Sequence, residues 1–167
     1  HIYPQAENAH LPKLTAFHLL SPAYKLGEPL RLICRQDRPE RLIAQLAVHE
    51  LDVVLADAPM PAGTKVRAFN HLLGEAPVAM FAPATLARRY RPRFPNSLEG
   101  APLLVPLEHT VLRRSLDEWL TAHQLRPTIV GEFEDSALLK VFASSGVGLF
   151  AAPVIVADDL RARYERA

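Results

Sequence analysis

Three carboxylates stand close together where one predicted strand ends and the next predicted helix begins. These residues are Glu132, Glu134 and Asp135, and Glu108 follows another predicted strand. Hard cations prefer carboxylate and carbonyl oxygens as ligands, so Glu108, Glu132 and Asp135 are candidates for a cation site. The alternative is that Asp135 caps the helix, while the other carboxylates are solvated or paired with arginine.

The sequence offers little for catalysis. His109 could contact a ligand or titrate near neutrality, whereas the single cysteine, Cys34, lies in an apolar run and is expected to be a buried, inert thiol. His49 does not open an H-E-x-x-H motif, because Val53 stands where the second histidine would be. G-x-S-x-G, G-x-G-x-x-G and Walker A patterns are also missing. We therefore expect no enzyme and no cofactor.

Composition narrows the class of protein further. The 167 residues are 49% hydrophobic and carry a net charge of +1, so the chain is expected to fold and has no global charge that would attract nucleic acid or anionic lipid. One cysteine excludes an intramolecular disulfide. Neither a secretion signal nor an apolar run of about 20 residues is visible, so we expect a cytoplasmic protein without a membrane span.

Strands and helices are predicted to alternate along the chain, which is typical of an α/β fold with mainly parallel strands. Residues 1–10 have no periodicity and are predicted to be a disordered arm or a remnant. Thr110 and Asp135 are predicted helix N-caps, as is Asp37. The predicted strands span 30–33, 53–56, 66–75, 78–81, 103–105, 129–130 and 147–150. The predicted helices span 11–24, 38–50 and 83–89, a segment after Thr110, a segment between Asp135 and Gly146, and 153–163.

Ligands of such sheets bind beyond the carboxyl ends of the strands. The helix N-termini at Thr110 and Asp135 offer free amides suited to an anion. The alternative is that these loops only connect elements. The candidate effector-binding residues that follow the predicted strands are Arg35, Gln36, Asp57, Ala58, Phe81, Pro106, His109, Thr110, Glu132, Phe133 and Phe150.

Five stretches of the chain resemble the effector-sensing half of LysR-type transcriptional regulators. They read GEPLRLICR (27–35), LIAQLAVHELDVVLADAP (42–59), LGEAPVAMFA (73–82), LLVPLEHTVLRRSLDEWL (103–120) and VGEFEDSALLKVFASSGVGLFAAP (130–153). The resemblance covers roughly residues 11–160, and it is strongest to activators of sodium/proton antiporter genes. Ala9 departs from it, because the family usually has an aspartate there.

This resemblance implies a two-lobed fold of the type 2 periplasmic-binding-protein kind, here truncated. Lobe I would be 11–75, and lobe II, with the start of the return to lobe I, would be 76–167. A small molecule or ion would bind in the cleft between the lobes, with sodium or pH as one candidate signal. Homodimers or homotetramers are implied, and DNA would be contacted only through a winged helix-turn-helix domain that is absent from this chain.

Two other classes of protein remain open from the residues. A solute-binding module of a transport system would share the fold but would need export. A small enzyme could use His109 and Glu132 as acid and base, although nothing in the sequence fixes the distance between them.

Overall fold

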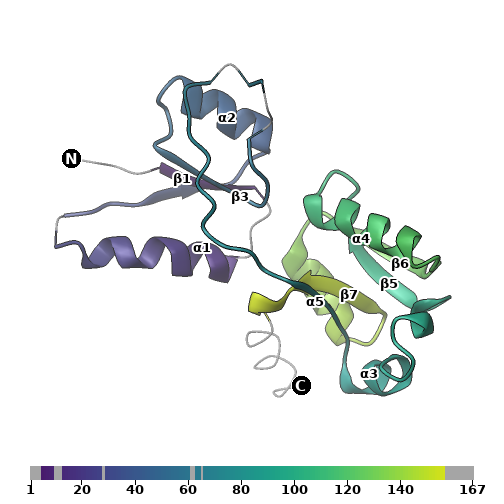
Figure 1. Cartoon of the computed structure of the whole chain (residues 1–167). Coiled ribbons are helices and arrows are strands. Elements are labelled where there is room, and N and C mark those ends of the chain that lie inside the picture. Colours follow the sequence, from purple (N-terminus) through teal and green to yellow (C-terminus); the bar gives the residue numbers. More distant parts are fainter. Residues whose placement is uncertain (1–4, 10–12, 28, 61–62, 65, 157–167) are drawn as a thin grey trace. The chain divides into compact units, whose positions relative to one another are not determined.

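The computed structural model describes residues 5–9, 13–27, 29–60, 63–64 and 66–156. It divides into two compact units, His1–Glu75 (unit 1) and Ala76–Ala167 (unit 2). Each unit has its own sheet with helices packed around it (Figure 1). The predicted α/β class with mainly parallel strands is confirmed, because, among the residues described, every strand pair except that of β4 and β7 is parallel.

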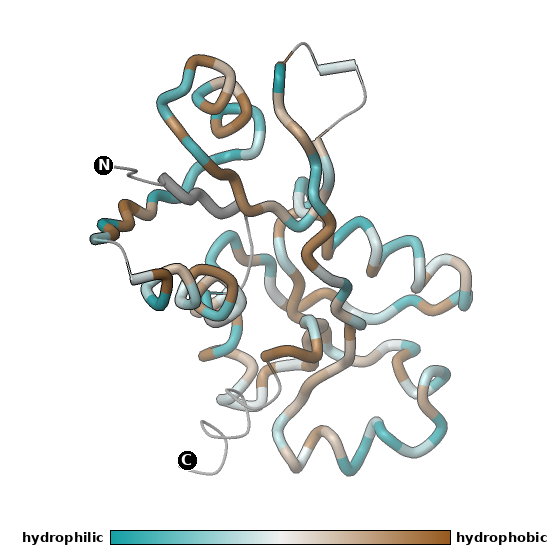
Figure 2. The backbone as a smooth tube through the Cα atoms, turned by 60° about the vertical axis from the view of Figure 1, so that its left-hand side comes forward, coloured by the Kyte–Doolittle hydropathy of each residue, from teal (hydrophilic) through white to brown (hydrophobic). Residues whose placement is uncertain are grey.

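Unit 1 contains a three-stranded parallel sheet in the order β2-β1-β3. Helices α1 and α2 lie on opposite sides of this sheet (Figures 1 and 2). The small core beneath α2 is formed by Leu42 and Leu51, with Leu46 and Val54 packed against them. The elements are β1 (Gln5–Ala9), α1 (Lys13–Leu20), the 3-10 helix η1 (Ser21–Lys25), β2 (Ile33–Arg35), α2 (Pro39–Ala47) and β3 (Val53–Ala56).

The prediction of a disordered arm over residues 1–10 is wrong for Gln5–Ala9, which form the central strand of unit 1. The sequence QAENA has neither an apolar run nor an apolar/polar alternation, so no pattern marks it as a strand. Its position between two strands supplies backbone pairing on both sides, and such a context overrides weak β-propensity. Residues 1–4 and 10 lie outside the described residues.

Other boundaries in unit 1 also differ from the prediction. Strand β2 begins at Ile33, where the predicted strand ended. The N-cap of α2 is Arg38 rather than Asp37, whose Oδ1 instead accepts a hydrogen bond from the Arg38 amide at 2.7 Å. The predicted strand over 66–75 does not form, because this exposed segment has no strand beside it with which to pair.

Unit 2 contains a four-stranded sheet in the order β4-β7-β5-β6. Strand β5 is parallel to β6 and β7, whereas β4 is antiparallel to β7. The strands are β4 (Val78–Phe81), β5 (Pro102–Pro106), β6 (Thr128–Phe133) and β7 (Leu149–Pro153). The helices are α3 (Ala84–Tyr90), α4 (Val111–Ala122) and α5 (Ser136–Ser144), with the 3-10 helices η2 (Asn96–Leu98) and η3 (Val154–Val156).

Strand β5 carries two hydrophobic clusters, one on each face of the sheet. Leu103 and Val105 pack in one cluster with Leu116 of α4, while Leu104 packs in the other with Leu139 of α5. Because successive side chains of a strand point to opposite faces, α4 and α5 cover opposite faces of the sheet. In Figure 2 the helices change colour along their turns, as burial of one helix face requires.

Local signals at the helix ends of unit 2 are confirmed. The side chains of Thr110 and Asp135 cap α4 and α5, and Gly146 follows α5 with φ of 85°. Among the apolar side chains of α5, Leu139 is buried, whereas Leu138 and Phe142 are exposed. The predicted final helix over 153–163 begins as the short 3-10 helix η3, and 157–163 lie outside the described residues.

No helix within the described ranges is long and apolar enough to cross a membrane.

Candidate functional site

The carboxyl ends of β5 and β6 bring several predicted site residues together in unit 2. Pro106 and Phe133 are register partners at the last position of each strand, and the Leu107 amide donates to the Phe133 carbonyl at 3.1 Å. Glu132 stands one position earlier, opposite Val105. The sequence correctly placed these residues at one edge of the sheet, because parallel strands end at the same edge.

Arg113 joins the parts of this edge, although it is not among the site residues predicted from the sequence. Its Nη1 donates to the Pro106 carbonyl at 3.0 Å and to Glu132 Oε2 at 3.1 Å. Its Nε lies 2.9 Å from Asp117 Oδ2, one helical turn further along α4. The guanidinium therefore ties the ends of β5 and β6 to α4, and only 8% of its side-chain surface is exposed.

The carboxylates around Arg113 keep its buried guanidinium charged. Burial by itself would lower the pKa of Arg113, but the hydrogen bond to Glu132 and the carboxylates of Asp117 and Glu132 outweigh it and raise the pKa above its ordinary value. A signal for this network was present in the sequence. Arg113 occupies the same helix face as the buried Leu116 and Leu120 and precedes Asp117 by four residues.

Thr110 uses its hydroxyl within the protein. Its Oγ1 donates to the Leu107 carbonyl at 3.0 Å and accepts from the Arg113 amide at 3.2 Å. With 4% of its surface exposed, Thr110 shapes the turn that leads into α4. His109, the preceding residue, is exposed on the same turn.

The predicted cluster of carboxylates does not form a cation site. Within the ranges that the structure describes, no group of three or more His, Cys, Asp or Glu residues could hold a metal ion. Glu132 instead pairs with Arg113, and Asp135 accepts a hydrogen bond from the Ala137 amide at 2.6 Å. Glu108 is exposed in the turn after β5. Glu132 and Asp135 are close in sequence, but each makes an interaction within the protein, with Arg113 and with the first turn of α5 respectively.

Replacing Asp135 with alanine is expected to lower the free energy of unfolding by about 1 kcal/mol, because the first turn of α5 loses its capping acceptor. Urea unfolding followed by the fluorescence of Trp119, the single tryptophan, measures this loss in unit 2. The control is Glu134→Ala at the exposed neighbouring position, for which a change below about 0.5 kcal/mol is expected. Equal losses in the two variants would contradict the capping role.

Two of the predicted effector residues lie elsewhere in unit 2. Phe150 is only 1% exposed and is paired with Leu104 inside the sheet, because β7 begins and ends later than predicted. Phe81 ends β4, which runs antiparallel to β7, so it lies beside Phe150 and level with Leu104 in the middle of β5 rather than at the carboxyl end of that strand. Its ring stacks on that of Phe150, with centroids 5.6 Å apart. Phe150 is thus a core residue rather than a ligand contact.

In unit 1, Arg35, the last residue of β2, and Gln36, which follows it, line a cavity of about 670 Å³. Lys13 of α1 lines the same cavity, so its largely apolar walls, which include Leu20 and Leu55, carry two cationic side chains. Such an arrangement suits a small molecule that carries a negative charge. Neither Lys13 nor the α1 wall was identified as part of a site from the sequence.

The other two candidate effector-binding residues of unit 1 lie at the carboxyl end of a neighbouring strand in the same parallel sheet. Asp57 and Ala58 directly follow β3, which is parallel to β1. Cys34 is exposed and lines the cavity, so the prediction of a buried thiol is wrong. Its strand is at the edge of the three-stranded sheet, where side chains are covered on fewer sides than in a central strand.

Comparison with known proteins gives consistent matches. The family model for the LysR substrate binding domain matches residues 9–165. The transcriptional activator protein NhaR of Escherichia coli K12 is 34% identical over 152 residues, which are 91% of this chain and 50% of NhaR, and NhaR of Shigella flexneri matches equally. The chain thus spans about half the length of these curated relatives.

Solved structures with the same fold include an effector binding domain and a regulatory domain. The effector binding domain of QuiR in complex with shikimate has a TM-score of 0.68 at 11% identity, covering 90% of this chain and 72% of that one. The reduced regulatory domain of OxyR2 from Vibrio vulnificus has a TM-score of 0.69 at 17% identity, covering 95% of this chain and 74% of that one. These similarities establish the type 2 periplasmic-binding-like fold.

Proposed function

Because the chain belongs to the LysR substrate-binding domain family, we propose that it is the effector-sensing part of a transcriptional activator similar to NhaR. The observation that carries this proposal is the 34% identity to NhaR over 91% of the chain. Unit 1 and unit 2 are then the two lobes of the regulatory domain. DNA contacts belong to a separate helix-turn-helix domain, and the regulator works as a homodimer or homotetramer in the cytoplasm.

Polar groups from both units support effector binding in this proposal. Arg35 and Gln36 offer a guanidinium and an amide at the cavity of unit 1. Pro106, Glu132 and Phe133 lie at the strand edge that Arg113 holds together in unit 2. Asp57, Ala58, His109 and Thr110 belong to the adjoining loops. The cationic Lys13 and Arg35 favour a small organic anion over a metal cation as the effector.

An effector that binds only the folded state is expected to raise the melting temperature of the chain. We expect a rise of about 4 °C or more from a member of a panel of potassium salts of hydroxylated carboxylates, beginning with shikimate, at concentrations far above its Kd. Sodium chloride compared with potassium chloride at equal ionic strength should give no difference. Differential scanning fluorimetry measures both.

Two matched variants make this measurement specific. Arg35→Gln removes the guanidinium from the cavity and should abolish the rise, whereas Arg31→Gln alters an exposed arginine just before β2 and should retain it. A rise that survives Arg35→Gln would contradict binding at this cavity. A sodium-specific rise would contradict the preference for an anion.

The regulatory role is tested in a chimera in which this chain replaces the matching half of E. coli NhaR. Transcription from an NhaR-activated promoter should then respond to the ligand that raises the melting temperature. Transcription that ignores this ligand would contradict the role and would favour the solute-binding alternative. Steady product formation from any panel member would instead favour an enzyme that uses His109 and Glu132.

A further inference from the structure

A second cavity lies entirely within unit 2 and has no part in the proposed effector site described above. Its volume is about 750 Å³, and its walls come from α3, α4, β4 and β7. Ligand sites in proteins typically enclose roughly 300–1,000 Å³, with mostly apolar walls and a few polar groups. The cavity is therefore large enough for a small organic molecule. Phe81 is the one predicted effector residue on its walls.

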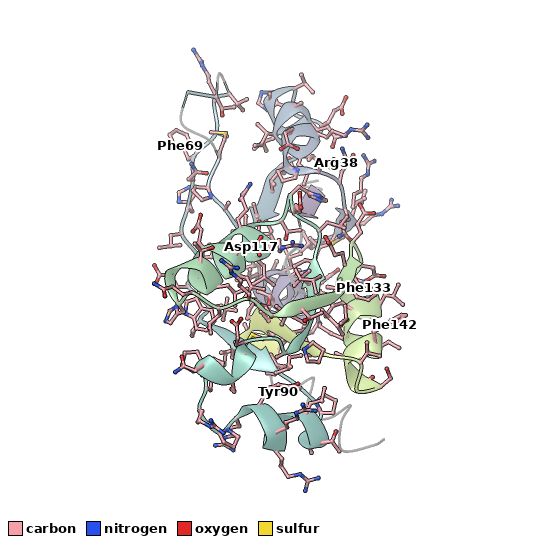
Figure 3. All side chains as sticks on the ribbon, turned by 90° about the vertical axis from the view of Figure 1, so that its right-hand side faces the viewer. Arg38, Phe69, Tyr90, Asp117, Phe133 and Phe142 are labelled. Carbon is pink, nitrogen blue, oxygen red and sulfur yellow. The ribbon has the colours of Figure 1, made fainter. Side chains whose placement is uncertain are left out.

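The walls of this cavity are apolar and rich in aromatic rings. Met80 of β4 and Leu112 and Trp119 of α4 line the cavity. Tyr90 of α3, labelled in Figure 3, lines it as well. The rings of Phe94 and Trp119 stack with centroids 6.0 Å apart and an interplanar angle of 19°. Half of the Phe94 surface is exposed. An aromatic or aliphatic body that entered here would remove this apolar surface from water.

The cavity has a cationic side. Arg91 is the charged residue on its walls, and Ser115 adds a hydroxyl. Arg88, Arg89 and Arg93 lie within three residues of Arg91 in the sequence. Among the described residues, the ion pairs involve Arg41 and Arg113 and none of these four arginines. An excess of positive charge beside an apolar cavity favours an anion with an apolar body.

We propose that this cavity binds an organic anion of that kind, such as an aryl-substituted carboxylate. The carboxylate pairs with the Arg91 guanidinium, and the apolar body lies against Met80 and Trp119. This site is distinct from the strand edge at Pro106 and Phe133. The walls of the cavity include none of Pro106, Arg113, Glu132 and Phe133, so a substitution in the lining of one site leaves the lining of the other unchanged.

Trp119 reports occupancy directly, since it lines the cavity and is the single tryptophan of the chain. The probe is 4-phenylbutyrate, with the neutral 4-phenylbutyramide as its matched control. The 167-residue chain should show a saturable change in Trp119 emission, and the amide should bind about tenfold more weakly, because it forgoes a charge-assisted hydrogen bond. No saturable change, or equal binding of acid and amide, would overturn the proposal.

Variants locate the binding. Arg91→Gln should remove the preference for the acid, while Arg88→Gln, an exposed change on α3 away from the walls, should leave it unchanged. Ala87→Leu on α3 and Ser115→Leu on α4 should each weaken the binding of both probes by filling the cavity. Thermal melting followed by circular dichroism confirms that each variant is folded. Undiminished binding in both filled variants would overturn the site.

A second copy of the chain is the competing occupant of this apolar surface. It would make Trp119 emission change with protein concentration in the absence of any probe. Such a change, with no saturable response to 4-phenylbutyrate, would overturn the proposal in favour of self-association. None of these outcomes depends on Arg35, so this site and the proposed effector site fail or succeed separately.

Discussion

Replacing Leu104 with alanine is expected to lower the free energy of unfolding of unit 2 by about 3–4 kcal/mol. Leu104 is completely buried at the centre of β5, in the cluster that α5 covers. Two glycines make room for it. A Cβ at Gly131 of β6 would lie 3.1 Å from Leu104 Cδ2, and a Cβ at Gly148, just before β7, would lie 3.2 Å from its Cγ. The site therefore cannot collapse around a smaller side chain without moving both neighbouring backbones.

Urea unfolding followed by Trp119 fluorescence measures this effect in unit 2. Leu104→Met keeps the side-chain volume and should cost less than about 1.5 kcal/mol. Val130→Ala removes an apolar group from β6 that is 44% exposed and should cost less than about 1 kcal/mol. A loss below about 1 kcal/mol for Leu104→Ala would show that α5 does not pack on this face of the sheet as the structure describes.

Short apolar runs and helix caps were readable from the sequence because they are local. Strands β3 and β4 have the predicted bounds, since each is an unbroken apolar run between polar or proline-containing segments. Thr110 and Asp135 cap their helices as predicted, because a cap requires only a side-chain oxygen and a free amide two or three residues later. These features do not depend on how distant segments pack.

The features that the sequence did not disclose depend on distant segments. Strand β1 is polar in sequence and is defined by its two neighbours. The antiparallel direction of β4 removed Phe81 from the edge where Pro106 and Phe133 end. Strand β7 begins and ends later in the sequence than predicted, so Phe150 is a core residue and does not lie at the end of the strand. Periodicity gives the type of an element but neither its direction in the sheet nor its last residue.

The carboxylates show the same limit in the candidate site. The sequence placed Glu132 and Asp135 near a strand end, and this placement is confirmed. Whether Glu132 is free to bind a cation depends on Arg113, which lies 19 residues away in the chain. The crossover helix α4 places the Arg113 guanidinium beside the Glu132 carboxylate. A guanidinium at this point converts a potential cation ligand into half of an ion pair. Identifying the residue types at a sheet edge is therefore insufficient without the helix that covers it.

Replacing Arg113 with methionine is expected to lower the free energy of unfolding of unit 2 by about 2–3 kcal/mol. The Pro106 carbonyl loses the donor at 3.0 Å, and the link between β5, β6 and α4 is removed. The loss is held below that of a fully buried ion pair because Asp117 and Glu132 are 48% and 45% exposed and can be hydrated again. Urea unfolding measures this loss, and the effector binding that we propose at this strand edge should weaken in parallel.

Three comparisons separate the network from a general effect of altering α4. Arg114→Met changes an exposed neighbour and should cost less than about 0.5 kcal/mol. Arg113→Lys keeps the charge but cannot reach Asp117, Glu132 and the Pro106 carbonyl at once, so it should recover only part of the loss. Because folding raises the pKa of Arg113, its contribution is complete below the ordinary arginine pKa and is lost only in strong base. The difference in the free energy of unfolding between the native chain and Arg113→Met should thus stay constant from about pH 6 to 9. If this difference disappeared within that range, the guanidinium would not be what links β5, β6 and α4.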